Sequence, residues 1–424
     1  MSRRIVTALM VLALIAPMVL AAGCGGKTGK AEPVTLQMLT MKQAAYSDTH
    51  INEMIQKFME ANPGITVQVT FVPYESLHDK IVTDQASGSG QYDVVLVDEI
   101  WPVEFAATNY IIPINDRITD EMKSGVNPSV LDILKVGDKY YGLPWILDTK
   151  FLFYNKDMLA RAGYDHAPAT WDELITMAKT IKQKGICEYP IAWSWAQAEA
   201  LICDYAQLVY SFGGEILAPD GTAKVNEDGA LQALKFMKKT LDDGLTNPNS
   251  TTYLEEDVRK ILSEGKAAFT LNWTYVLALA NDPASSQVAG QIAIAPTPAG
   301  PAGAVGVSGS MGLAITGSSK HPDEAWKLIE FLCSEANQKQ YASDSLPIWT
   351  AALDAPDLNA PKDLVAAAKV QFAHVKGRPE FVTWYNAFST KLQVAIQNVL
   401  LGKQTPEDAM NAMVPEAAKL KSGQ

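Results

Sequence analysis

The feature that most constrains the fold is an alternation of strand and helix patterns that begins at residue 34. Residues 34–38 are a short apolar strand pattern, residues 51–59 place apolar side chains at helical spacing, and Asn62-Pro63-Gly64 ends that helix. Residues 65–71 alternate as a strand, and a second helix is expected over residues 74–87. The continuous apolar run at residues 94–97 is typical of a parallel strand buried on both faces. The order predicts a doubly wound α/β fold.

Later segments continue this pattern with clear helix starts. Thr170-Trp171-Asp172-Glu173 is a capping box that opens a helix through residue 182, and Thr405-Pro406-Glu407-Asp408 opens the last helix. Pro322 stands where the first residue of another helix is expected. Residues 296–309, PTPAGPAGAVGVSG, are too rich in glycine and proline for a regular element. We expect this segment to cross between two domains.

The N-terminus carries an export pattern. Residues 5–26 read IVTALMVLALIAPMVLAAGCGG behind Arg3 and Arg4, which predicts a signal peptide over residues 1–23 and lipid attachment at Cys24. The pattern resembles the lipobox of bacterial lipoproteins, except that Ala21 replaces the usual leucine. Residues 24–32 then read as lipid anchor and flexible tether. A transmembrane anchor of about 20 residues and a twin-arginine signal are the alternatives.

The composition narrows the function classes. The net charge of −12, with 47 acidic and 35 basic residues, argues against nucleic acid as a partner, because phosphate backbones need concentrated Lys and Arg. No later segment has 18 uninterrupted apolar residues, so the body of the chain is expected to be soluble outside the cytoplasm. Cys187 and Cys203 can form a disulfide in an exported chain or remain two buried thiols. Cys333 falls on the apolar face of a helix and is expected in the core.

Two kinds of residue are candidates for ligand binding. Asp98 follows the apolar run 94–97, at the carboxyl end of a strand, where open α/β sheets bind ligands; its alternative role is a helix N-cap. Several of the nine tryptophans stand beside turns or polar residues, among them Trp145, Trp195 and Trp273. An indole has a flat apolar face and one N–H donor, which suits a sugar ring. Core packing is the alternative for any single tryptophan.

The chain resembles the extracytoplasmic solute-binding proteins of ABC transporters, in particular the carbohydrate-binding group that includes trehalose/maltose-binding proteins. The resemblance runs from about residue 34 to the C-terminus. It rests on FMEANPGITV, YDVVLVDEIW, YYGLPWILDTKFLFYN, EGKAAFTLNWTYV and GRPEFVTWYNAFSTKLQVAIQNVLLGKQTPEDAM in this order. It implies a two-lobed periplasmic-binding-protein-like α/β fold with a hinge and an interlobe ligand cleft.

The resemblance also implies roles for individual residues. Asp98 and Asp148 would accept hydrogen bonds from sugar hydroxyls, Arg378 would donate to them, and Trp273 would stack under a ring with Tyr275 nearby. The segment 309–315 resembles the family's Gly-Gly-Trp-x-Leu-Ala-Ile turn, so Gly309, Ser310 and Met311 are further candidates. Met311 replaces the aromatic residue and Ser310 the second glycine. Ile146 falls where disaccharide-binding relatives carry an aromatic residue.

We expect one lobe to hold residues 33–145 and 306–345 and the other to hold residues 146–305 and 346–424. The expected partners are a carbohydrate ligand, ABC transporter permease subunits and the membrane through the lipid anchor, and the protein is expected to act as a monomer without cofactor or metal.

Two alternative functions remain open. An exported glycan hydrolase needs two carboxylates about 5–10 Å apart, which the sequence cannot place. A lipoprotein receptor for a non-sugar solute has the same anchor and cleft.

Overall fold

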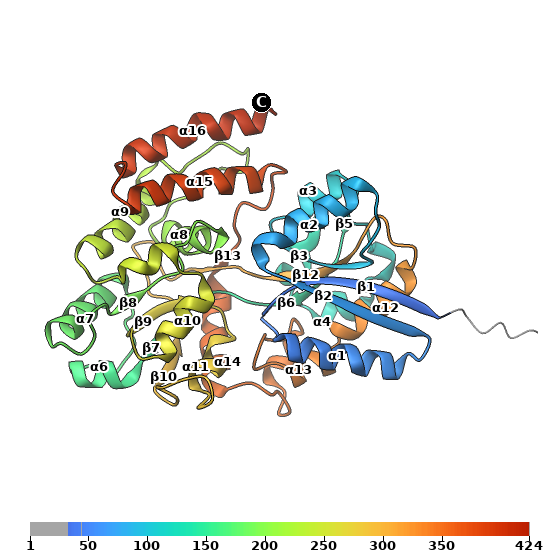
Figure 1. Ribbon diagram of the computed structural model, residues 1–424, viewed down its shortest axis with the longest axis horizontal. Helices are drawn as coiled ribbons and strands as arrows, with labels where there is room; N and C mark the ends of the chain where they lie inside the picture. Colours follow the sequence, from blue (N-terminus) through green and yellow to red (C-terminus); the bar gives the residue numbers. More distant parts are fainter. Residues whose placement is uncertain (1–32, 44, 424) are drawn as a thin grey trace, which may run out of the picture.

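The computed structural model describes residues 33–43 and 45–423, so the predicted signal peptide and Cys24 lie outside the described residues. These residues form two α/β lobes side by side (Figure 1). The first lobe is built on a five-stranded sheet of order β2-β1-β3-β12-β6. Its strands are β1 (Val34–Met41), β2 (Ile65–Val72), β3 (Val94–Asp98), β6 (Leu143–Ile146) and β12 (Met311–Ile315).

The predicted alternation of strands and helices at the start of the chain is confirmed. β1 pairs in parallel with β2 and β3, and the five residues of β3 are all buried, as the continuous apolar run indicated. On its other side β3 pairs antiparallel with β12, which returns from more than 200 residues later in the chain. A parallel sheet is therefore extended by an antiparallel strand that local sequence patterns did not predict.

The second lobe has a four-stranded sheet of order β10-β7-β9-β8. β7 pairs antiparallel with β10 and β9, and β8 pairs in parallel with β9. The strands are β7 (Phe151–Asn155), β8 (Ile191–Ala192), β9 (Phe269–Asn272) and β10 (Ile292–Ala295). Two short pairs complete the strands: β4 (Lys135–Val136) with β5 (Lys139–Tyr140), and β11 (Gly306–Val307) with β13 (Val375–Lys376).

Helices cover both sheets (Figure 1). Around the first sheet lie α1 (Asp48–Ala61), α2 (Tyr74–Ser87), α3 (Pro102–Ala107), α4 (Asp120–Gly125), α5 (Pro128–Leu131), α12 (Pro322–Leu332) and α13 (Glu335–Gln340). The second lobe carries α6 (Lys156–Ala162), α7 (Trp171–Gln183), α8 (Glu199–Ser211), α9 (Asp228–Asp242), α10 (Glu255–Ser263), α11 (Val276–Asn281), α14 (Lys362–Gln371), α15 (Tyr385–Leu400) and α16 (Pro406–Ser422). None of the described helices is long and apolar enough to cross a membrane.

The helix starts follow the local signals in the sequence. Thr170 caps α7, because its hydroxyl oxygen accepts from the Glu173 backbone N–H, and Thr405 caps α16 in the same way. Pro322 is the first residue of α12. Cys333 follows that helix and is completely buried in the first lobe's core, as its place on the apolar face predicted.

The chain crosses between the lobes in neighbouring segments. One crossing is residues 147–150, between β6 in the first sheet and β7 in the second, and another is the segment that ends in β12. Isolated bridges pair Leu147 with Leu346 and Thr149 with Ser308, so the crossings lie against one another. Residues 296–309 are mostly irregular, as predicted, but Gly306–Val307 forms β11 within them. Several paired crossings give the two lobes a common hinge.

The three described cysteines are free and buried. Cys187 Sγ lies 3.4 Å from both the Tyr189 and the Lys266 carbonyl oxygens, whereas Cys203 lies on α8 in the wall of a cleft. Of the two arrangements that the sequence left open for Cys187 and Cys203, a disulfide or two buried thiols, this structure has the second. A spacing of sixteen residues fixes loop length but not whether two side chains meet in the fold.

Candidate ligand-binding cleft

A cleft with a cavity of about 230 Å³ lies between the lobes, lined by residues from both. The first lobe supplies the ends of its strands: Met41 ends β1, Asp98 ends β3, and Met311 begins the antiparallel β12 at the same edge. Carboxyl ends of parallel strands meet at one edge of a sheet, where side chains face a crevice instead of the core. The site thus follows from the sheet topology.

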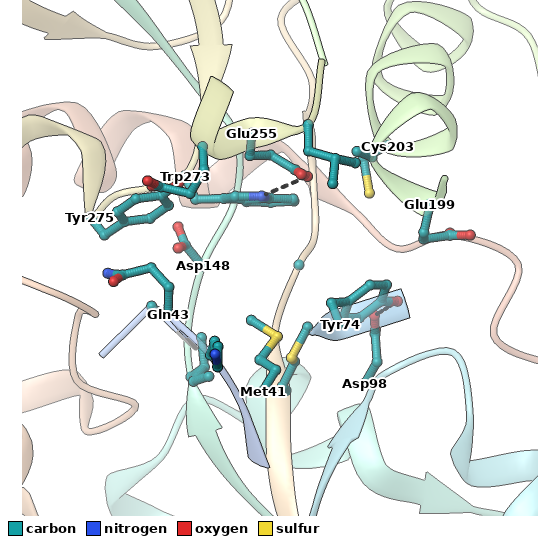
Figure 2. A pocket seen from close by; sticks show the side chains of 18 of the residues that line it. Met41, Gln43, Tyr74, Asp98, Asp148, Glu199, Cys203, Glu255, Trp273 and Tyr275 are labelled. Atoms are coloured by element: carbon teal, nitrogen blue, oxygen red, sulfur yellow. Dashed lines mark hydrogen bonds between the residues drawn. The ribbon is translucent and has the colours of Figure 1, made fainter. Parts of the chain in front are cut away.

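The second lobe supplies an aromatic wall and helix N-termini. Trp273 follows β9 directly, Tyr275 is close behind it, and Glu199 and Glu255 are the first residues of α8 and α10. Carboxylates at the first position of a helix are stabilised by the helix dipole. Figure 2 shows the Trp273 indole across the cleft from Met41, with Tyr74 and Asp98 on the same far side as Met41.

Trp273 is held in place by contacts from several segments. Its indole N–H donates to the Glu255 carboxylate at 3.3 Å (dashed in Figure 2), and its backbone N–H donates to the Asn272 side chain at 2.9 Å. A Cβ atom added at Gly309 would lie 2.5 Å from the six-membered ring, so only glycine allows this approach of the backbone to the indole. The ring and the Met41 side chain opposite it give the cleft two apolar surfaces, and Met311 also lines the cleft.

Arg378 joins carboxylates from both lobes. Its guanidinium donates to Asp98 Oδ1 at 2.7 Å and to Glu199 Oε1 at 2.9 Å, and its side chain is 2% exposed. The Tyr74 hydroxyl donates to the other oxygen of Asp98 at 2.6 Å. Asp98 therefore does not cap α3, which was its alternative role. Two N–H groups of Arg378 are engaged, and within residues 33–43 and 45–423 its Nε–H has no hydrogen-bond partner.

Burial raises the pKa of two acidic side chains of the cleft. The pKa of Asp148 is raised to about 7 by burial, although hydrogen bonds from Thr274 and Thr149 favour its charged form. Burial also raises the pKa of Glu199, against the opposing effect of Arg378. Asp148 already accepts from the Thr149 N–H at 2.8 Å and from the Thr274 hydroxyl at 3.0 Å. It has limited capacity for further donors.

Seven of the ten residues predicted to bind ligand line this cleft: Asp98, Asp148, Trp273, Tyr275, Gly309, Met311 and Arg378. Ile146, singled out by its departure from an aromatic residue, lines it as well. Ser310 faces a second cavity of about 320 Å³ beside the crossings. The structure therefore places Ser310 behind the cleft wall.

The expectation for Trp145 and Trp195 is wrong in this structure. Both side chains are fully buried and neither lines the cleft. Trp145 packs on Tyr46 in the first core with ring centroids 5.0 Å apart, and Trp195 stacks on Trp193 in the second core at 5.1 Å. Core packing, the alternative for any single tryptophan, decides both positions.

Sequence reasoning missed Tyr74, Glu199 and Glu255. Tyr74 follows β2, whose carboxyl end lies at the same sheet edge as that of β3, so the rule that selected Asp98 also applied to Tyr74. Glu199 and Glu255 had no comparable signal, since they reach the cleft only through the packing of α8 and α10. Among the described residues, no group of three His, Cys, Asp or Glu side chains could hold a metal ion.

Two lobes, a hinge of paired crossings and a cleft at the strand ends define the class of two-lobed solute-binding proteins. The family model for bacterial extracellular solute-binding proteins matches residues 45–339, and the chain belongs to this family. Its members are the binding proteins of ABC transporters and are not enzymes.

Individual relatives agree with this assignment. A protein of Deinococcus radiodurans named "Probable ABC transporter-binding protein" is 32% identical over 84% of this chain and 87% of its own. T. maritima MalE3, solved with maltose bound, has a TM-score of 0.85 and 31% identity over 91% of this chain and all of its own. A solute-binding protein of Thermotoga lettingae with α-D-tagatose bound has a TM-score of 0.82 and 27% identity over 91% and 99%. The predicted fold class is thereby confirmed.

Proposed function

We propose that this protein is the lipid-anchored substrate-binding component of an ABC importer and that it binds a neutral sugar or oligosaccharide reversibly in the interlobe cleft. The observation that carries the proposal is the Trp273 platform, an indole with one face toward a mainly apolar cleft that also presents several carboxylates and the Arg378 guanidinium. A sugar ring offers an apolar C–H face to such an indole and hydroxyls to the groups around it. The similarity to proteins solved with maltose and tagatose supports the same ligand class.

The polar groups of the cleft suit an uncharged polyol. Asp98, Glu199 and Glu255 present carboxylate oxygens, which accept hydrogen bonds from hydroxyl donors. An unpaired buried polar group costs about 1–3 kcal/mol, so a ligand with many hydroxyls needs such partners. Arg378 donates hydrogen bonds both to Asp98 of the first lobe and to Glu199 of the second. These bonds hold the two carboxylates close together in the cleft.

Delivery to the permease requires that the bound and free states differ in shape. We propose that the lobes, residues 33–145 with 306–345 and residues 146–305 with 346–424, close on the ligand about the paired crossings. The permease then recognises the closed form. Small-angle scattering with and without a tightly binding sugar should show a more compact particle with the sugar, and identical profiles would contradict the closure.

A thermal-shift screen followed by calorimetric titration tests the ligand class. The panel contains maltose, trehalose, D-tagatose, mannitol, amino acids, a dipeptide and a polyamine. We expect at least one carbohydrate to raise the melting temperature and to be recovered unchanged after binding. A response to the dipeptide or the polyamine alone would overturn the sugar assignment in favour of a receptor for a non-sugar solute. Release of a cleaved glycan would favour the hydrolase.

Two substitutions connect that binding to the cleft. Asp98→Ala and Trp273→Ala should each weaken binding about tenfold or more, because they remove a charged hydrogen-bond acceptor and the stacking face. Trp384→Ala is the matched control, since this partly exposed indole does not line the cleft. Equal affinity in the Trp273 and Trp384 variants would exclude Trp273 as the platform.

A further inference from the structure

Lys150 carries a fully buried charge in the second lobe. It is the residue just before β7, and its ammonium lies 2.5 Å from Asp204 Oδ1 and 3.0 Å from the Ser194 hydroxyl. The side chains of Lys150 and Asp204 are both 0% exposed. Removing two charges from water costs several kcal/mol per ion, and well-packed apolar residues of similar volume often stabilise a core as well or better. Stability is therefore a weak reason for this pair.

The ammonium of Lys150 lies over the Trp273 ring. The distance from Nζ to the ring centroid is 5.2 Å, within the range of a cation–π contact. Trp273 lines the cleft and Lys150 does not. Since Lys150 is fully buried and does not line the cleft that Trp273 faces, we infer that its charge lies behind the indole, on the side turned away from the cavity. The platform thus has a ligand-facing front and a cation behind it.

The charge behind the indole is secured by its surroundings. Burial lowers the pKa of Lys150, but the carboxylates of Asp204 and Glu255 outweigh burial and leave the pKa above its ordinary value. Lys150 therefore stays protonated over the whole physiological range. Glu255 is also the acceptor of the Trp273 indole N–H, so the ammonium and this carboxylate restrain the ring from its rear face and from its edge.

We propose that Lys150, paired with Asp204, is a positioning and selectivity residue for Trp273: it holds the indole in place and makes the cleft-facing side of the ring prefer the neutral C–H face of a sugar over a cation. The electron-rich face of an indole attracts cations. The ammonium on the rear face competes for the same ring electrons, so it weakens the attraction of the front face for a second cation. The inference rests on the proposed sugar-binding function for its physiological meaning, whereas the electrostatic effect is a property of the free protein.

The first experiment needs no ligand. Lys150→Met/Asp204→Asn removes both charges and leaves the net charge of the protein unchanged. Because the two members of the ion pair are replaced together, neither charge is left buried without its partner. Fluorescence quenching by caesium ion and by neutral acrylamide is measured on this variant and on the wild type, each with its Trp273→Phe counterpart so that the Trp273 signal is obtained by difference. We expect the ratio of caesium to acrylamide quenching of Trp273 to rise about twofold or more in the variant. An unchanged ratio would overturn the selectivity role.

The second experiment uses the neutral sugar with the largest thermal shift in the screen and D-glucosamine as a cationic probe. Calorimetry should show about fivefold weaker binding of the neutral sugar to the double variant, and a smaller loss or a gain for glucosamine. An equal loss for both would contradict the selectivity role. Ser194→Ala is the matched control: it removes one hydrogen bond to Lys150, keeps the charge, and should leave the quenching ratio unchanged.

Circular dichroism and thermal unfolding check that the variants fold. If the methionine variant does not fold, Lys150→Gln/Asp204→Asn replaces the ion pair with two neutral amides and is tested in the same way. Failure of every sugar to bind would refute the proposed function, and the quenching ratio would still decide the role of Lys150. The two proposals can therefore fail independently.

Discussion

Substituting Gly309 with alanine tests the platform without removing any group that could touch a ligand. An added Cβ would lie 2.5 Å and 2.6 Å from two carbons of the Trp273 ring, about 0.9 Å short of the 3.4 Å at which ordinary contact begins. The Gly309 backbone cannot recede easily, because its N–H donates to the Asp148 carbonyl at 3.1 Å in the neighbouring crossing. The indole must therefore shift by close to this distance.

The shift has two measurable consequences. Forcing a methyl group into a packed contact destabilises a protein by typically about 1–3 kcal/mol, which urea unfolding detects. A gap of about 0.5–1 Å loses a quarter to a half of the dispersion attraction between surfaces, so a displaced indole stacks less well on a ring. We expect Gly309→Ala to weaken binding of the best sugar by about tenfold in calorimetric titration.

Gly64→Ala provides the matched control for this substitution. Gly64 lies in the exposed turn between α1 and β2, and no atom lies within 4 Å of a Cβ added there. Its stability and sugar affinity should equal those of the wild type. If Gly309→Ala behaved like Gly64→Ala in both assays, Trp273 would be free to move aside, and the argument that it is a rigid platform would be refuted.

Three further predictions concern the cleft and the anchor. Burial raises the pKa of Asp148 from 3.8 to about 7 in the folded protein. Between these pH values the folded protein keeps a proton that the unfolded chain has released. The protonated Asp148 therefore contributes to the free energy of unfolding fully below about pH 4, and this contribution is lost as the pH rises to 7. Urea unfolding of Asp148→Asn should show a smaller loss of stability over that interval, and a slope equal to that of the wild type would exclude the raised pKa. Arg378→Met leaves the buried carboxylates of Asp98 and Glu199 without their shared cation. It should lower the free energy of unfolding by about 3–5 kcal/mol. A change below about 1 kcal/mol would show that the stability of the fold does not depend on these ion pairs. Cys24→Ser should release the protein from the membrane fraction or leave an uncleaved precursor, because a buried lipid contributes about 0.8 kcal/mol per methylene to membrane binding. Fractionation and N-terminal analysis distinguish these outcomes. Unchanged retention with an N-terminus at residue 24 would exclude lipid attachment there.

Local features of the chain could be predicted because they depend on neighbouring residues. The helix α2 begins and ends where the sequence predicted, and Thr170 and Thr405 cap α7 and α16 through their own hydroxyls. The buried strand β3 follows from its uninterrupted apolar run. Periodicity and capping act over a few residues, so the sequence by itself determines these elements.

The position of Asp98 was also open to prediction, since a side chain at the carboxyl end of a parallel strand has a restricted set of environments. Its partners were not. Tyr74 and Arg378 are 24 and 280 residues away from Asp98 along the chain, and only the packing of α2 and of the segment after β13 brings their donors to its two oxygens.

Tertiary structure alone decided which tryptophans face the cleft. Trp145, Trp195 and Trp273 all stand beside polar or turn residues in the sequence, yet the first two are buried in the cores and only the third lines the cavity. An indole is equally suited to a core and to a sugar ring, so its local sequence carries little information about its role. Trp273 differs from the other two tryptophans in its contacts with residues from distant segments. These residues are Lys150 behind the ring, Glu255 at the indole N–H and Gly309 close to the ring. A binding platform depends on such long-range contacts, and these exist only after the chain has folded.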